Sequence, residues 1–314
     1  MKKGILFILM ATILFSSMEC VLKLIAGQLH PLQVTWLRFT VGALILLPLA
    51  LNQLKKRRIT LAKRDWVYFS SLGLFGIVIS MTLYQLAVIN AEASVVTVVF
   101  SSNPIFVIPL SALMLGTKIH WYHLAALALD VLGILFIINP FNLTISAAGL
   151  AFSLLAPIFF ALYSTMGKKR TEMGGIVNTC FGFLCGCAEL GMLMLLSHIP
   201  AVADAMPLAL FRDIPFFSGL TLNNLPHMFY VSVFVTGIGF ASYFLAIEHT
   251  SPVTASLTFF LKPVIAPFFA KAILGEQMSA LQVVGVCIIF IGSMFNFIPS
   301  LKQHKMLPEK QAAG

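Results

Sequence analysis

Long apolar runs dominate the chain, and each is long enough to form a helix that crosses a membrane. About 20 helical residues cover the roughly 30 Å of a bilayer's hydrocarbon core. Strands of a membrane barrel would instead be short and would alternate polar with apolar residues. The pattern therefore predicts an all-α polytopic membrane protein with ten transmembrane helices. The predicted helices cover residues 4–26, 32–51, 66–89, 94–115, 121–138, 147–167, 176–197, 227–247, 253–274 and 280–298.

The composition agrees with this interpretation and limits where function can reside. Hydrophobic residues make up 59% of the chain and charged residues 10%, whereas a soluble domain has about 25% charged residues. The ten runs hold about two thirds of the 314 residues. No room is left for a separate soluble catalytic or nucleic-acid-binding domain, so the functional residues must lie within the helix bundle.

The basic residues predict the orientation in the membrane. With the N-terminus in the cytoplasm, the segments between spans place nearly all of the loop Lys and Arg inside and only Arg212 and Lys271 outside. This distribution follows the positive-inside rule, and it predicts cytoplasmic termini in a multi-pass protein of the cell (plasma) membrane. The formal charge of +9 then reflects topology and attraction to anionic membrane lipid, and no nucleic-acid partner is expected.

An internal duplication is the most informative feature of the sequence. Residues 84–138 align without gaps to 243–297 at an offset of 159, with matches that include a Tyr-x-Leu-Ala phrase, mid-span prolines and Leu-Gly at the span ends. At an offset of 145 the first span aligns with the sixth, with matches that include Phe15/Phe160 and Lys23/Lys168. We therefore expect one five-helix repeat in residues 1–139, a second in 146–298, and a cytoplasmic tail in 299–314.

Two five-helix repeats must enter the membrane in opposite orientations, because five is an odd number. Inverted repeats give a protein two related conformations that open to opposite sides, as alternating access requires. This arrangement favours a secondary transporter. An intramembrane enzyme is the alternative from another class, but the sequence has no H-E-x-x-H, G-x-S-x-G or paired-aspartate motif. No cofactor and no metal site are expected.

The phrases Y-Q-L-A-V-I-N-A-E-A-S (84–94) and Y-F-L-A-I-E-H-T-S-P (243–252), together with ten spans in two repeats, resemble the drug/metabolite transporter superfamily of the EamA type. The resemblance covers about residues 4–297. It implies a central cavity lined chiefly by spans one, three, four, six, eight and nine. It also implies export of amino acids or related metabolites, with a lipid or lipid-linked metabolite flippase as the alternative within the transporter class.

Two prolines mark predicted helix breaks at matching positions of the repeats. Asn103-Pro104 lies in the middle of span four, and Lys262-Pro263 in the middle of span nine. A proline leaves a carbonyl of the preceding turn without its helical partner, and at membrane depth such a carbonyl must face protein or water. Packed kinks without a ligand are the alternative. We expect substrate contacts from Asn103 and Lys262 at these breaks.

Charged residues within the spans are further candidates, since an ammonium in mid-membrane costs about 2.5–3.5 kcal/mol and requires a partner. Lys262 binds a substrate carboxylate in one hypothesis and pairs with Glu19 in the other. Glu19 and Lys23 lie four residues apart and are predicted to pair, with Glu19 either structural or a proton carrier, so that both are coupling candidates. Arg38 either steers anions to the outer mouth or tethers to carbonyls or lipid phosphate.

Aromatic and acidic residues complete the prediction. Tyr84 and Tyr243 occupy matching positions, and Tyr163 lies beside the position that matches Glu19. We expect their hydroxyls to contact a polar ligand, with packing as the alternative, and we interpret Asp130 and Glu189 as structural. The expected partner is a small zwitterionic or anionic substrate that moves by proton coupling or exchange. A second copy of the chain, in a homodimer, is the other candidate partner.

Overall fold

All ten predicted spans are helical in the computed structural model, which describes residues 2–138, 146–205, 209–275, 277 and 279–292. Eight form apolar helical segments of 21 to 28 residues. The remaining two are the helix Trp121–Ile138 and the shorter helix Ala280–Gly292. The all-α polytopic fold class is therefore confirmed, while residues 299–314 lie outside the described part of the chain.

The first half of the chain contains five spans. The first two are the single helices α1 and α2, the third is built from α3, η1 and α4, the fourth from α5 and α6, and the fifth is α7. Their bounds are α1 Lys2–Leu24, α2 Pro31–Arg57, α3 Lys63–Gly73, η1 Leu74–Met81, α4 Thr82–Asn90, α5 Ala93–Phe100, α6 Asn103–Leu115 and α7 Trp121–Ile138.

The second half repeats this order with one insertion. After α8 and α9, a connection holding α10 and η2 precedes a composite span of α11, η3 and α12, and then α13, α14 and η4. Their bounds are α8 Ala147–Lys168, α9 Gly175–Leu196, α10 Pro200–Ala205, η2 Ala209–Phe211, α11 Leu225–Tyr230, η3 Val231–Gly239, α12 Phe240–His249, α13 Pro252–Ala255, α14 Leu257–Phe269 and η4 Ala270–Leu274. The helix Ala280–Gly292 completes the described spans.

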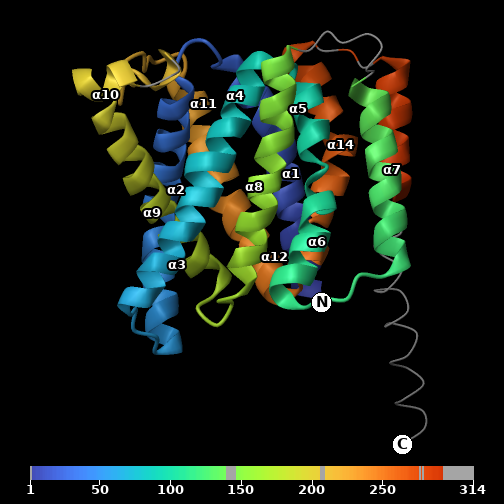
Figure 1. The fold of residues 1–314 in the computed structure, drawn as a ribbon, viewed down its shortest axis with the longest axis horizontal. Coiled ribbons are helices and arrows are strands. Elements are labelled where there is room, and N and C mark those ends of the chain that lie inside the picture. The colour runs from blue at the N-terminus through green and yellow to red at the C-terminus, as the bar shows by residue number, and fades with distance from the viewer. Residues whose placement is uncertain (1, 139–145, 206–208, 276, 278, 293–314) are drawn as a thin grey trace, which may run out of the picture.

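The two halves run through the bundle in opposite directions. In Figure 1, α1 starts at the lower end of the bundle and α8 starts at the upper end. The composite spans three and eight each contain a π-helix, η1 and η3, and the 159-residue offset makes these two segments overlap. Because π-helical turns are rare and concentrate at functional positions, their recurrence identifies spans three and eight as related elements.

Small residues allow the helices to approach closely. A Cβ atom placed on Gly73 of α3 would lie 2.3 Å from the backbone nitrogen of Gly186 in α9. A Cβ atom on Gly133 of α7 would lie 2.6 Å from a side-chain carbon of Ile289 in the last helix. Such contacts bring helices together where lipid offers no hydrophobic driving force for their association.

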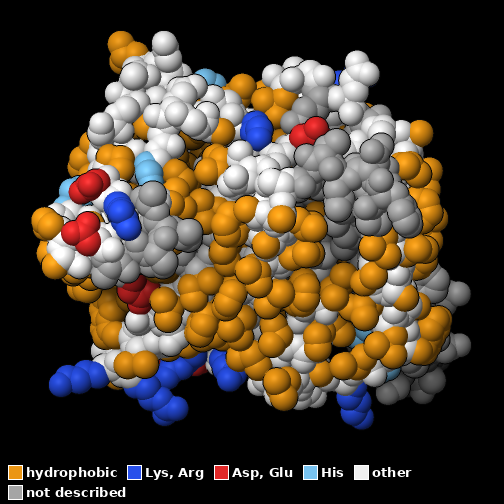
Figure 2. All heavy atoms as spheres, turned by 45° about the horizontal axis from the view of Figure 1, so that its top comes forward, with side chains coloured by type: hydrophobic (Ala, Val, Ile, Leu, Met, Phe, Trp, Pro, Cys, Tyr) orange, Lys and Arg blue, Asp and Glu red, His pale blue; other side chains and the backbone are white. Residues whose placement is uncertain are grey.

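The outer surface is suited to lipid. Large apolar side chains such as Leu113, Leu195 and Phe268 have exposed fractions of 84%, 63% and 73%. Figure 2 shows a broad band of hydrophobic side chains, with Lys and Arg gathered along its lower edge. An apolar band with charges below it is the surface that a membrane-embedded bundle requires.

Candidate functional site

A buried ion pair joins the first and ninth spans at the centre of the bundle. The Nζ atom of Lys262 in α14 donates a hydrogen bond to Oε1 of Glu19 in α1. Both side chains have no solvent exposure. A charge at this depth is costly without a partner, so the pair stabilises the contact between α1 and α14. Of the two hypotheses for Lys262, pairing with Glu19 is the one realised here.

Aromatic rings enclose the ion pair and come in three repeat-related pairs. We call the set the aromatic centre: Phe15 and Phe160, Tyr84 and Tyr243, Phe100 and Phe259. Lys262 Nζ lies 5.4 Å from the ring centroid of Phe100 and 5.8 Å from that of Tyr84, within the range of a cation–π attraction. The centre thus supplies further stabilisation of the ammonium.

Contacts within the aromatic centre cross between the halves. Phe100 lies 5.4 Å from Phe160 and 5.6 Å from Phe259 between ring centroids, and Phe15 lies 6.2 Å from Tyr243. The six residues come from spans one, three, four, six, eight and nine. These are the spans that the family resemblance implied for a central cavity.

Arg38 of α2 also lies in this core, which the sequence did not indicate. Its side chain has no solvent exposure, and its guanidinium carbon lies 4.7 Å from the ring centroid of Phe39. Its Nη1 atom donates to the sulfur of Met18 at 3.3 Å. Complete burial does not agree with a role at an outer mouth or at lipid phosphate. Among the described hydrogen bonds, none joins the Arg38 side chain to a carbonyl, the third predicted partner. The available signal was that Arg38 is the seventh residue of the predicted span 32–51, since a helix in a bundle buries one face along its whole length.

The three predicted tyrosines and Asn103 are all buried around the same core. The Nδ2 atom of Asn103 donates to the carbonyl of Pro157 in α8 at 3.0 Å, and its Oδ1 atom has no hydrogen-bond partner in the described structure. Tyr163 packs on Phe244 with ring centroids 4.9 Å apart. The structure therefore gathers the predicted polar residues, with Tyr84 nearest to the ion pair.

The charges break the symmetry of the repeats. Asn103 corresponds to Lys262 at the offset of 159, and Ser164 corresponds to Glu19 at the offset of 145. Glu19 and Lys262 are therefore an acid and a base, whereas the residues that match them, Ser164 and Asn103, are neutral and polar. The two halves thus have similar folds, but only one of the two repeat-related pairs of positions is charged.

The two predicted helix breaks have different outcomes. Span four is interrupted between Phe100, where α5 ends, and Asn103, where α6 begins, directly before Pro104. The predicted break at Pro263 is wrong, because α14 continues through it and the interruption lies at Ser256. A proline removes one hydrogen bond, and a helix can pass it with local adjustment. Proline alone therefore did not locate this break.

Lys23 does not pair with Glu19 as predicted, because it caps another helix. Its Nζ atom donates to the carbonyls of Val88 and Ala91, at 3.0 and 2.7 Å, at the C-terminal end of α4. The last carbonyls of a helix lack internal partners and carry partial negative charge. A lysine ammonium supplies both hydrogen-bond donors and positive charge. Lys23 therefore binds the C-terminal end of α4 and does not pair with Glu19 one turn away.

The repeat-related Lys168 makes the same contact at the opposite end of the bundle. Its Nζ atom donates to the carbonyls of Ile247 and Thr250, at 2.8 and 2.9 Å, at the end of α12. These acceptors are the residues that match Val88 and Ala91 at the offset of 159. We call the two arrangements the Lys23 clasp and the Lys168 clasp. In Figure 1 the end of α4 lies at the top and that of α12 at the bottom.

Ion pairs reinforce the lower end. Arg57 of α2 pairs with Glu248 of α12 at 2.5 Å, and Arg170 pairs with Asp65 of α3. Glu248 also accepts from the backbone N–H of Gly175 at the start of α9. At the end of α4, beside the Lys23 clasp, the position that matches Glu248 holds Ile89. An apolar side chain cannot form such an ion pair.

The remaining acidic candidates lie away from the centre. Glu189 in α9 is partly exposed and accepts a hydrogen bond from Ser70 of α3. Asp130 belongs to α7, which lies at one edge of the bundle in Figure 1, and its side chain is outside the described structure. Glu189 has no described contact with the aromatic centre.

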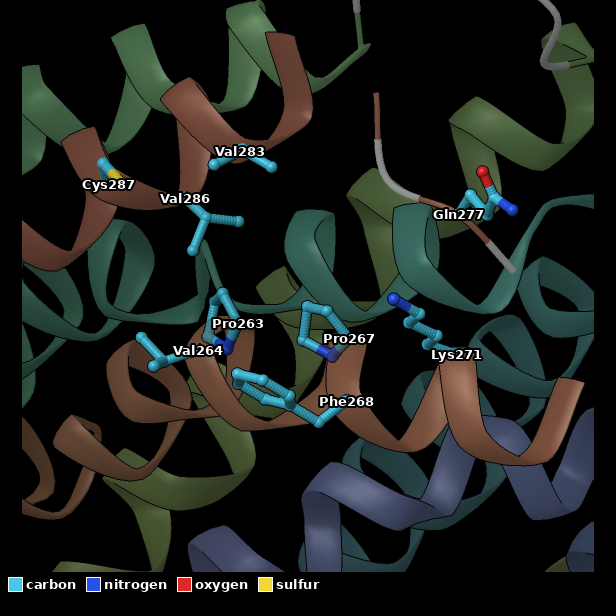
Figure 3. Close-up of a pocket in the computed structure, with 9 residues that line it drawn as sticks. All are labelled: Pro263, Val264, Pro267, Phe268, Lys271, Gln277, Val283, Val286 and Cys287. Atoms are coloured by element: carbon cyan, nitrogen blue, oxygen red, sulfur yellow. The ribbon is translucent and has the colours of Figure 1, made fainter. Parts of the chain in front are cut away.

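A surface groove of about 520 Å³ separates α14 and η4 from the last helix. Figure 3 shows apolar side chains such as Pro263 and Val286 along most of its length, with Lys271 and Gln277 at one end. Lys262 is not among the residues that line it. Pro263 and Lys262 therefore lie on different faces of α14, and the groove is separate from the Glu19–Lys262 pair.

The fold and the site together define a class of protein: a multi-pass helical membrane transporter of two repeats with charged residues at the interface between them. A solved structure agrees with this fold over 95% of this chain and 98% of its own, with a TM-score of 0.71 and 16% sequence identity. That likeness concerns the fold alone.

The family follows from the sequence. The EamA-like transporter family matches residues 2–139 and 147–298, and the chain belongs to this family. It is 33% identical to an uncharacterised transporter of Clostridium kluyveri, over 98% of this chain and 96% of the relative. It is 27% identical to protein PecM of Dickeya dadantii over 70% and 68%. It is 25% identical to the pseudopaline exporter CntI of Pseudomonas aeruginosa over 59% and 63%.

Proposed function

We propose that this transporter is a secondary exporter of amino acids or similarly small metabolites, working by alternating access. The observation that carries the proposal is the buried Glu19–Lys262 pair at the contact of α1 and α14. An ion pair that is dry in one conformation can exchange its internal partner for a charged substrate in another. The substrate is small and carries at least one carboxylate.

The direction of transport rests on the relatives. The chain is similar to a protein named as a pseudopaline exporter, and the EamA-like match extends over both repeats. Export of a small metabolite agrees both with this similarity and with the complete burial of the Glu19–Lys262 pair.

For coupling, we assign Glu19 the role of proton carrier. Its carboxylate can hold a proton when Lys262 turns to the substrate, and it can release that proton when the pair re-forms. This exchange links substrate binding to one proton without a separate ion site. Proton and substrate then leave the cell together, so the outward gradient of the substrate drives export, and the coupling needs no ionisable residues beyond Glu19 and Lys262.

The test for Lys262 is efflux from cells preloaded with radiolabelled amino acids. Lys262→Met should abolish efflux, because the variant has no cation to exchange between Glu19 and the substrate. The double variant Glu19→Gln/Lys262→Met is the matched control, since it removes both members of the pair and leaves neither charge without its partner. Normal efflux by the double variant would make the pair structural and would refute the proposal.

Coupling is tested with the purified protein in vesicles that hold the same substrates. An imposed pH gradient should change the flux through the wild type. Glu19→Gln should carry substrate at a rate independent of the gradient, because its amide cannot exchange a proton. Unchanged pH dependence in this variant would remove Glu19 from coupling. Redistribution of labelled phospholipid without amino-acid flux would instead favour a flippase.

A further inference from the structure

The central core carries one more positive charge than negative charge. Among the described residues, the fully buried charged side chains at this depth are Glu19, Lys262 and Arg38. Glu19 and Lys262 neutralise each other, and Arg38 interacts electrostatically with both. No further described carboxylate is in contact with Arg38. The core therefore holds a net charge of +1.

Arg38 is also poorly satisfied as a hydrogen-bond donor. A guanidinium has five N–H donors, and the described contact of Arg38 is to a thioether sulfur, Met18 Sδ at 3.3 Å, which is a weak acceptor. Its Nε and Nη2 atoms have no hydrogen-bond partner, although the side chain is completely buried. A buried charge left in this state is strongly destabilising, so the arrangement calls for an acceptor that the protein does not itself provide.

The chemistry of that acceptor follows from the charge and the geometry. A carboxylate fits the guanidinium fork with two parallel hydrogen bonds and cancels a single positive charge, whereas a phosphate dianion would reverse the sign of the core. Nε and Nη2 lie on one edge of the guanidinium and can both donate to one carboxylate. Phe39 packs beside Arg38, and Phe183 and Phe240 pack on Phe39 with ring centroids 4.7 and 5.3 Å away. Apolar surroundings suit a ligand whose remaining part is apolar.

We infer that Arg38 is the carboxylate-binding residue of the transport site and that the substrate binds as a monoanion. This inference rests on the proposed function, and it narrows the substrate from a zwitterionic or anionic metabolite to one with a net charge of −1. In this arrangement Arg38 receives the carboxylate first, in place of the Met18 sulfur, while Glu19 and Lys262 are still paired, and Lys262 turns from Glu19 to the substrate in a later step.

The first test is the stability of purified protein in detergent without substrate. Arg38→Met should raise Tm, because it removes an unpaired charge from the core and leaves an apolar side chain of similar length. Lys55→Met, at an exposed position of α2, is the control for loss of a positive charge and should leave Tm unchanged. A lower Tm for Arg38→Met would show that Arg38 supports the fold, and would overturn the inference.

The second test uses acetate as a minimal carboxylate probe and acetamide as its uncharged counterpart. Replacing chloride with acetate at constant ionic strength should raise the Tm of the wild type, because acetate binds only the folded protein. Acetamide should not, and Arg38→Met should respond to neither. An equal response of wild type and variant to acetate would contradict binding at Arg38.

Transport provides the third readout. Arg38→Met, although more stable, should lose efflux of monoanionic substrates by about 10- to 100-fold, as expected when hydrogen bonds to a charged ligand are lost. Arg38→Lys should retain part of this efflux, since its ammonium keeps the positive charge but lacks the two parallel N–H donors of a guanidinium. Normal efflux by Arg38→Met would overturn the inference. A wild type that binds acetate through Arg38 but moves no solute would leave this inference intact and refute the proposed function.

Discussion

At the scale of single residues, the two buried cations of the core differ in the partners that surround them. Lys262 has a carboxylate and two aromatic rings within reach, whereas Arg38 has a thioether and one ring. The same membrane depth therefore holds one satisfied cation and one unsatisfied cation. This contrast distinguishes Lys262, which has an internal partner in this conformation, from Arg38, whose N–H donors are largely unsatisfied.

The ion pair predicts a non-additive effect on stability. Glu19→Gln and Lys262→Met should each reduce the free energy of unfolding by about 3–5 kcal/mol, because each leaves the other charge buried and unpaired. The double variant should recover most of this loss, since two neutral side chains remain. Thermal unfolding of the four proteins in one detergent measures the cycle. Losses that simply add would show that the two residues act independently.

At the scale of helices, the clasps close the bundle at both ends. The Lys23 clasp ties α1 to the end of α4, and the Lys168 clasp ties α8 to the end of α12. Each joins two spans that contribute to the aromatic centre. Because both are formed in this structure and the core has no solvent exposure, the conformation is closed to both sides. An opening toward one side requires the clasp at that end to separate.

The clasps predict opposite changes in access to the core. Cys20 is buried next to Glu19 and can report access by reaction with a membrane-impermeant maleimide, in a background where the other four cysteines are replaced. Lys23→Met should speed labelling from the upper side of the bundle only, and Lys168→Met from the lower side only. Lys→Arg at each position retains the donor and is the matched control. Equal acceleration from both sides in either variant would show that the clasps do not act as separate closures.

The ends also differ in strength, which bears on the resting conformation. The lower end adds the Arg57–Glu248 and Arg170–Asp65 pairs, whereas Ile89 takes the place of Glu248 at the upper end. These pairs are partly exposed, so each contributes little by itself. Together with the Lys168 clasp they nevertheless favour the lower closure, and we therefore expect the smaller effect on labelling from Lys168→Met.

At the scale of the whole molecule, orientation follows from where the basic residues lie. The end of α2, the connection to α3 and the start of α3 lie at the lower end of the bundle in Figure 1. Exposed basic residues there are Lys55, Lys56, Arg58, Lys63 and Arg64. Basic loops remain on the cytoplasmic side during insertion. We therefore expect the lower end to be cytoplasmic, with the Lys23 clasp on the outer side.

This orientation is testable with single cysteines in a background without the native ones. Glu92 precedes α5 at the upper end, and Glu172 lies in the connection between α8 and α9 at the lower end. In intact cells an impermeant maleimide should label Glu92→Cys and should label Glu172→Cys only after the membrane is permeabilised. Labelling of both in intact cells would contradict the inverted arrangement, whereas the reverse pattern would invert the assignment of the two ends.

The sequence by itself determined which segments form apolar helices and their approximate bounds, because the length and polarity of a segment decide whether it can cross a bilayer. It also revealed the duplication, since related positions such as Tyr84 and Tyr243 keep a constant offset, and it identified Lys262 as a charge that requires a partner. These properties depend on a residue and its near neighbours along the chain.

Only the tertiary structure decided which groups meet. Glu19 has Lys23 one helical turn away, yet it pairs with Lys262, which lies 243 positions further along the chain. Lys23 turns to the end of α4, and Arg38 lies in the core without a carboxylate of its own. Hydrophobic periodicity records that a side chain is buried, but a partner is set by how helices distant in sequence pack against each other. The chemistry of the site therefore depends on the packing of α1, α2 and α14.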